Sequence, residues 1–225
     1  MSGDFSLLLN LASLKEAALN LLFPRWCLGC GREGDYICLS CLERLPRLTA
    51  TCLTHLDQPL SIDGIYAPFR FEGTIRHAIH ELKYRHLRAL SGTLAALMYE
   101  YLAENGLPGE VLVPVPLHGR RLRQRGYNQS ALLAAGLSRL CGLPLEGGCL
   151  VRRRMAPAQA ESASLNERKA NVAGAFGCRN RRLEGKKVLL IDDVATSGAT
   201  LNACATALKE AGAAAVRGLT LPRDI

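Results

Sequence analysis

The stretch Val188-Leu189-Leu190-Ile191-Asp192-Asp193-Val194-Ala195-Thr196-Ser197-Gly198-Ala199-Thr200 decides the fold. Its first four residues are apolar, as in a central parallel strand that is covered on both faces. A helix is expected from Thr200 to Ala211, because Gly212 is a residue that commonly ends helices. A buried strand, a polar turn and a helix in this order predict an α/β fold with a site at the carboxyl end of the strand.

The turn between this strand and this helix has the composition of a phosphate-binding loop. Backbone N–H groups at a helix N-terminus converge on one spot, and the helix dipole adds positive potential there. Gly198 lets the backbone approach a ligand closely, and Thr196, Ser197 and Thr200 add hydroxyl donors. The turn is not a Walker loop, because it lacks the Gly-Lys-Ser/Thr of that motif. It therefore predicts a site for a phosphate monoester.

Asp192 and Asp193 distinguish this loop from a simple phosphate site. Two carboxylates beside a phosphate would repel it unless they had another role. One such role is to accept hydrogen bonds from vicinal sugar hydroxyls, with a nearby metal ion relieving the repulsion. The structural alternative is a strand end with an aspartate helix cap, which accounts for one aspartate but not for the whole string.

The rest of the chain from Gly64 alternates strands and helices. Four strands are expected, at residues 65–71, 111–116, 188–191 and 216–221. Four helices are expected: one with its apolar face at Ile75, Ala78, Ile79 and Leu82, and others at 94–102, 128–140 and 200–211. This alternation predicts a mainly parallel sheet with helices on both faces.

A linker rich in Thr, Pro and Asp precedes this region and predicts two domains, residues 1–60 and 61–225. The first begins with an apolar-rich segment, 5–23, whose leucines recur at the spacing of an amphipathic helix. Lys15 and Glu16 interrupt that segment, so we expect no membrane span, although peripheral membrane contact is an alternative. The absence of a basic leader and of a cleavage site favours a cytoplasmic location.

Four cysteines follow this segment in two closely spaced pairs, Cys27-x2-Cys30 and Cys38-x2-Cys41. Four thiolates in this pattern form a tetrahedral site that suits zinc and fills its coordination, so a structural role is expected. A redox dithiol is the alternative. Cys52 and His55 are the nearest further candidates for a second metal ion, and the odd cysteine total argues against a secreted disulfide framework.

Positive charge concentrates between residues 118 and 187, which hold 15 Lys/Arg and 4 Asp/Glu. One basic cluster contains Arg120, Arg121, Arg123 and Arg125, and a second contains Arg152, Arg153 and Arg154. Such a segment suits a phosphate-rich partner, either a small phosphorylated substrate or a nucleic acid. The structural alternative is a solvated basic surface.

The loop from Asp192 to Thr200 resembles the signature of the type I phosphoribosyltransferases. The resemblance implies that phosphoribosyl pyrophosphate binds here together with magnesium. Asp192 and Asp193 would then hold the ribose 2′ and 3′ hydroxyls. The 5′-phosphate would lie against Ala195, Thr196, Ser197, Gly198, Ala199 and Thr200.

Three further segments narrow the resemblance: Leu82-Lys83-Tyr84, Val113 to His118, and Arg120 to Gln129. Together they are similar to the ComF family of bacterial competence proteins, also called GntX-like, which pair a zinc ribbon with a phosphoribosyltransferase domain. The resemblance implies a pyrophosphate loop at Pro114, Val115 and Pro116. It also implies that Arg168, or the arginines at 120–125, stabilise the departing pyrophosphate beside Asp192 and Asp193.

The resemblance implies a function in competence and DNA uptake, with single-stranded DNA, a competence helicase or another DNA-uptake protein as a partner. Two alternatives stay open. The protein is an active phosphoribosyltransferase, a pentosyl transferase acting on an unidentified nitrogen acceptor, or it is a non-catalytic DNA-binding or scaffold protein. No segment identifies an acceptor base or an oligomeric state.

Overall fold

The computed structural model describes residues 24–48, 60–106, 108–153 and 174–224. They fall into two compact units, one ending at Leu45 and one beginning at Pro46. The larger unit starts before residue 61 because Pro46 O accepts a hydrogen bond from Arg70 N at 2.8 Å, and Leu48 N donates to Pro68 O at 2.9 Å. The amphipathic helix expected over 5–23 lies outside the described residues, as do Cys52 and His55.

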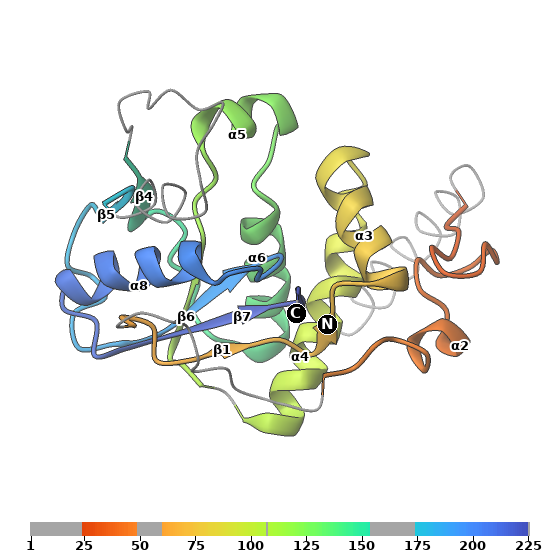
Figure 1. The fold of residues 1–225 in the computed structure, drawn as a ribbon, viewed down its shortest axis with the longest axis horizontal. Helices are drawn as coiled ribbons and strands as arrows, with labels where there is room; N and C mark the ends of the chain where they lie inside the picture. Colours follow the sequence, from red (N-terminus) through yellow and green to blue (C-terminus); the bar gives the residue numbers. More distant parts are fainter. Residues whose placement is uncertain (1–23, 49–59, 107, 154–173, 225) are drawn as a thin grey trace, which may run out of the picture. The chain divides into compact units, whose positions relative to one another are not determined.

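A four-stranded sheet forms the centre of the larger unit (Figure 1). Its order is β1 (Ile65–Tyr66), β7 (Ala215–Thr220), β6 (Lys187–Asp192) and β3 (Val111–Pro114). Every neighbouring pair is parallel, as expected. Val188 to Ile191 of β6 are fully buried, which explains why this strand is a continuous apolar run.

Helices cover both faces of this sheet, which confirms the expected layers. Figure 1 shows α8 (Ala199–Glu210) on one face and α6 (Gln129–Cys141) on the other. Helix α4 (Leu90–Asn105) packs against α6, and α3 (Gly73–Tyr84) precedes it in the chain. The four residues expected on the apolar face of α3 are all buried: Ile75, Ala78, Ile79 and Leu82.

The chain leaves β3 and β6 in opposite directions across the sheet. After β3 it passes through α6 to Leu145, which forms a parallel bridge with Leu112 on the outer side of β3. After β6 it passes through α8 to β7, on the other side. The carboxyl ends of β3 and β6 are therefore a topological switch point, where open α/β sheets form ligand crevices.

Three elements differ from the sequence-based expectation. The strand expected at 65–71 is two short strands, β1 and β2 (Phe69–Arg70), the second of which pairs with β8 (Pro222–Arg223). The interruption includes Pro68, which has no N–H to donate. An unexpected helix, α5 (Gly119–Arg125), follows β3, and an unexpected antiparallel pair forms between β4 (Leu150–Arg152) and β5 (Phe176–Cys178). Among the described helices, none is long and apolar enough to cross a membrane.

Candidate functional site

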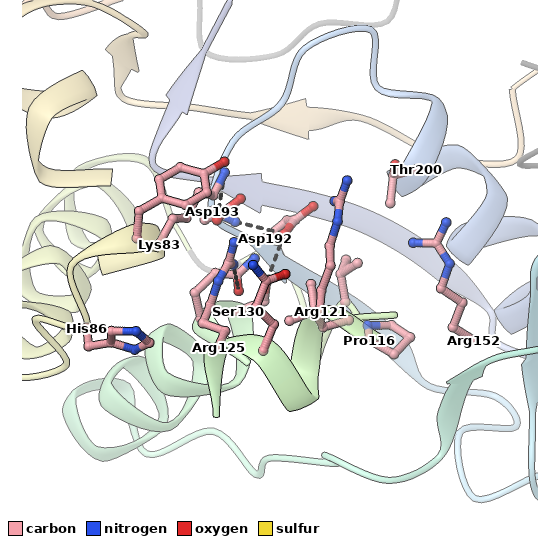
Figure 2. Close-up of a pocket in the computed structure, with 15 residues that line it drawn as sticks. Lys83, His86, Pro116, Arg121, Arg125, Ser130, Arg152, Asp192, Asp193 and Thr200 are labelled. Carbon is pink, nitrogen blue, oxygen red and sulfur yellow. Dashed lines mark hydrogen bonds and ion pairs between the residues drawn. The ribbon is translucent and has the colours of Figure 1, made fainter. Parts of the chain in front are cut away.

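A cavity of about 430 Å³ lies at the switch point between β3 and β6 (Figure 2). Its floor includes Asp192 and Asp193 at the end of β6. The loop after β3 contributes Val115 and Pro116 to its lining. Cations and polar groups complete the lining: Lys83, His86, Arg121, Gln124, Arg125, Ser130 and Arg152. Two segments that the sequence analysis quoted far apart therefore meet in one site.

The two aspartates are held by different partners. Asp192 Oδ1 accepts hydrogen bonds from Ser130 Oγ at 2.8 Å and from the backbone N–H of Asp193 at 2.9 Å. Asp193 is 4% exposed, and its Oδ2 lies 2.9 Å from Lys83 Nζ. Figure 2 shows Ser130 beside Asp192 and Lys83 beside Asp193. The carboxylates are thus fixed before any ligand arrives, as a pre-organised site requires.

This environment raises the pKa of Asp192 to about 7. The main cause is desolvation, and the negative charge of Asp193 adds to it, whereas the hydrogen bond from Ser130 opposes it. An aspartate with this pKa exchanges its proton near neutral pH. A shift of this kind, produced by burial and a like charge in a cavity, is typical of functional sites.

The contact between Lys83 and Asp193 is an ion pair whose geometry is not that of a hydrogen bond. Asp193 Oδ2 consequently accepts no hydrogen bond from the described residues, although it is buried. A buried carboxylate oxygen without a hydrogen-bond donor is costly, and native proteins seldom leave one in that state. The atom can accept a hydrogen bond from a ligand hydroxyl.

The loop after β6 has the form expected of a phosphate site. A small cavity of about 30 Å³ is lined by Asp192 and by the backbone from Val194 to Leu201. Gly198 begins α8 with φ 70°, the left-handed region that glycine adopts without strain. Ala195 does not offer its amide here, because Ala195 N donates to Pro222 O at 3.1 Å. The free amides and hydroxyls must therefore come from Thr196 onward.

The loop after β3 is anchored to its neighbours by hydrogen bonds. Val115 N donates to Ile191 O at 2.9 Å, and Val115 O accepts from Asn128 Nδ2 at 2.9 Å. Pro114 is the last residue of β3 and is buried, while Val115 and Pro116 line the cavity. The loop and the aspartates thereby face the same cavity, where one ligand can contact both.

Helix α5 divides the first basic cluster between two faces. Arg121 and Arg125 line the cavity, whereas Arg120 and Arg123 are exposed and belong to none of its described lining. Residues four apart share a helix face, which explains why Arg121 and Arg125 act together. The cavity therefore offers two of the four arginines to an anion.

Sequence reasoning missed several residues of this site. Lys83 was noted only as part of a family segment, and its link to Asp193 has no local sequence signal. Ser130 follows the N-cap of α6, where its hydroxyl faces Asp192. Arg152 enters the cavity from β4, an element that was not expected. Arg168, a predicted catalytic residue, lies outside the described residues.

The smaller unit brings its four cysteines together as predicted. The Sγ atoms of Cys27, Cys30, Cys38 and Cys41 all lie within 4.8 Å of one another. Tetrahedral coordination at a zinc–sulfur distance of about 2.3 Å places sulfur atoms about 3.8 Å apart, and Cys30 Sγ lies 3.7 Å from Cys38 Sγ. The arrangement fits a thiolate-bound metal ion.

Two further features of the smaller unit favour thiolate ligands. The hydroxyl of Ser40, 3.3 Å from Cys38 Sγ, is the main cause that lowers the pKa of Cys38 to about 6. Cys38 N also lies 3.4 Å from Cys27 Sγ, as expected where a backbone amide donates to a metal-binding sulfur.

Comparison with known proteins gives consistent relatives. Residues 128–223 match the model of the phosphoribosyl transferase domain family. Competence protein F of Haemophilus influenzae is 31% identical over 202 residues, covering 84% of this chain and 80% of that protein. DNA utilization protein YhgH of Escherichia coli is 34% identical over 152 residues, 65% of this chain and 66% of that protein.

A third relative, competence protein ComFC of Bacillus subtilis, is 39% identical over 115 residues, covering 51% of this chain and 45% of that protein. The matched domain model includes β6, both aspartates, the phosphate loop and α8. The expected type I phosphoribosyltransferase fold, preceded by a cysteine cluster suited to a zinc ribbon, is confirmed.

Proposed function

This chain belongs to the competence protein F (ComF) family, and from that premise we propose that it binds phosphoribosyl pyrophosphate and acts in competence or DNA utilization. The names of its relatives suggest the biological role. The ligand is inferred from the site itself. The proposal includes the cytoplasmic location expected from the sequence.

The paired aspartates beside the phosphate loop carry this proposal. Asp192 and Asp193 offer carboxylate oxygens at the end of β6, and Asp193 Oδ2 has no hydrogen-bond donor among the described residues. Vicinal ribose hydroxyls supply two donors at this spacing. The adjacent helix N-terminus of α8, with its hydroxyl-rich turn, suits the 5′-phosphate of the same sugar.

Arginines on the opposite wall suit the pyrophosphate. Arg121, Arg125 and Arg152 line the cavity together with the loop after β3. Guanidinium groups form bidentate contacts with phosphate oxygens, so they favour a polyanion in this position. Magnesium would bind with the pyrophosphate and supply further positive charge. The same cations could stabilise pyrophosphate as a leaving group, which is the basis of the enzyme alternative.

Zinc is the metal that we propose for Cys27, Cys30, Cys38 and Cys41. Four thiolates exclude the oxygen-preferring ions calcium and magnesium, and a complete sulfur set is typical of structural zinc. A direct contact with single-stranded DNA or with a competence helicase is also proposed, because the exposed Arg120 and Arg123 remain outside the cavity.

Isothermal titration calorimetry with phosphoribosyl pyrophosphate and magnesium tests the ligand. Saturable binding at one site per chain supports the proposal, whereas no heat at millimolar ligand contradicts it. Incubation of the complex with a panel of nitrogen acceptors, followed by assay of released pyrophosphate, then separates the two alternatives. Turnover identifies an enzyme, and binding without release identifies a sensor or scaffold.

A further inference from the structure

A second hollow lies along helix α3, on the other side of Lys83 and Tyr84 from the main cavity. We call it the α3 groove. It encloses about 630 Å³ between Phe71, Arg76, His80 and Tyr84 on one side and Val194 and Thr196 on the other. Tyr84 lines both the groove and the main cavity, so the two hollows share a wall.

Aromatic rings dominate the helix side of the groove. The rings of His80 and Tyr84 lie 4.8 Å apart at 48°, and Tyr84 is 61% exposed. The guanidinium of Arg76 lies 6.0 Å from the centre of the Phe71 ring. Exposed aromatic side chains gathered in a hollow mark a binding surface, because a flat ligand can cover them by stacking.

The polar groups of the groove select the kind of ring. Its described lining contains no aspartate or glutamate, so it lacks a carboxylate that could accept hydrogen bonds from exocyclic amino groups. Lys83 is engaged by Asp193 at 2.9 Å, which leaves Arg76 as the main cation. A guanidinium donates only, and it therefore favours a ring whose edge carries carbonyl oxygens or negative charge.

We propose that the α3 groove binds a planar, oxo-substituted heteroaromatic ring of the kind found in uracil and thymine. Stacking on His80 and Tyr84 would hold its faces, and Arg76 would bind its carbonyl edge. The ring comes either from a free small molecule or from a base of single-stranded DNA, since both present the same chemistry. The inference goes beyond the proposed function and does not depend on phosphoribosyl pyrophosphate.

Fluorine NMR provides a direct test with free probes. 5-Fluorouracil, titrated into the full-length protein without other ligands, should show saturable line broadening, whereas 2-fluoroadenine should bind more weakly. A 12-residue oligothymidylate with one 5-fluorodeoxyuridine tests the DNA source. Selective binding of either uracil-type probe supports the proposal and identifies the source. No binding of either, or equal binding of 2-fluoroadenine, overturns it.

Variants locate the binding. Arg76→Gln and His80→Ala should each raise the dissociation constant of the bound probe about fivefold or more, as expected for the loss of one stacking or polar contact. Tyr99→Ala, on α4, removes another partly exposed tyrosine that does not line the groove, and it should have no effect. Unchanged binding in both groove variants overturns the assignment.

Calorimetry with phosphoribosyl pyrophosphate separates this proposal from the previous one. Arg76 and His80 do not line the main cavity, so their variants should bind that ligand as the wild type does. Probe binding without phosphoribosyl pyrophosphate binding would contradict the proposed function and leave the groove supported. The reverse result would contradict the groove alone.

Discussion

Lys83 Nζ lies 2.9 Å from Asp193 Oδ2, and this ion pair ties the end of α3 to the loop after β6. The side chain of Lys83 is 20% exposed and that of Asp193 is 6% exposed. Removing the lysine leaves a carboxylate in a buried position without its counter-charge. The same contact fixes the carboxylate that is proposed to receive a ribose hydroxyl, so it matters for stability and for ligand binding.

Lys83→Met should lower the free energy of unfolding by about 2–3 kcal/mol, toward the low end for a buried pair because the lysine is partly exposed. Urea denaturation measures the change. Lys187→Met is the matched control, since its contact with Glu110 is 3.9 Å long and exposed, and it should cost less than about 1 kcal/mol. Equal effects in the two variants would show that the Lys83 contact contributes no special stability.

Asp192→Asn should remove a pH dependence of stability. The ordinary pKa is 3.8 and the folded-state pKa is about 7. Between these values the folded protein holds a proton that the unfolded chain lacks, so this group makes stability fall as pH rises from about 4 to 7. The asparagine variant should therefore gain on the wild type over that range and hold its gain above it.

Urea denaturation of both proteins at pH 5 and pH 8 tests this. The amide oxygen that Asp192→Asn introduces can still accept the hydrogen bonds from Ser130 and from the Asp193 amide. Asp35→Asn, an exposed position in the smaller unit, is the control. A difference between wild type and Asp192→Asn that is the same at both pH values would contradict the raised pKa.

The sequence predicts the central strand well and the site only in part. Val188 to Ile191 must be covered on both faces, so their apolar run identifies β6 without further information. The phosphate loop is equally local. Lys83 and Asp193 are far apart in the chain, and a partner of this kind leaves no periodic signal.

Helix α5 was missed because Gly119 to Arg125 has almost no apolar residue, and apolar periodicity is the main helix signal. Its ends are nevertheless marked. His118 Nδ1 accepts a hydrogen bond from Arg120 N at 3.2 Å, and Gly126 ends the helix with φ 74°. A search for caps would have found it. The same helix explains why only Arg121 and Arg125 reach the cavity.

One zinc ion per chain is expected in the purified, reduced protein. The small unit has little apolar material, so metal binding should supply much of its folding energy. Inductively coupled plasma mass spectrometry measures the ratio. Cys30→Ser should reduce it from about one to near zero, whereas Cys141→Ser, at the end of α6, should not change it.

A zinc ratio near zero in the wild type under reducing conditions would contradict this assignment. A ratio near two would mean that Cys52 and His55 take part in a second site.

Single-stranded DNA should bind with modest, strongly salt-dependent affinity. Neutralised phosphates release counterions, so the affinity falls steeply as salt rises. Arg120→Ser with Arg123→Ser should reduce the slope of that dependence by about 1 and leave phosphoribosyl pyrophosphate binding unchanged. Electrophoretic mobility shifts at several salt concentrations provide the measurement, with Arg44→Ser with Arg47→Ser as the control pair.

No shift even at low salt would end the nucleic-acid proposal. A shift that phosphoribosyl pyrophosphate abolishes would instead place the DNA in the main cavity, on Arg121 and Arg125.

The central claim is that Asp192 and Asp193 receive the ribose hydroxyls of phosphoribosyl pyrophosphate. Calorimetric titration of the ligand with magnesium into wild type and into Asp192→Asn with Asp193→Asn tests it most directly, with circular dichroism to verify folding. We predict a folded double variant whose dissociation constant rises about tenfold or more, because each lost charged hydrogen bond is worth about 1.5 kcal/mol or more. Equal affinity in a folded double variant would contradict the account.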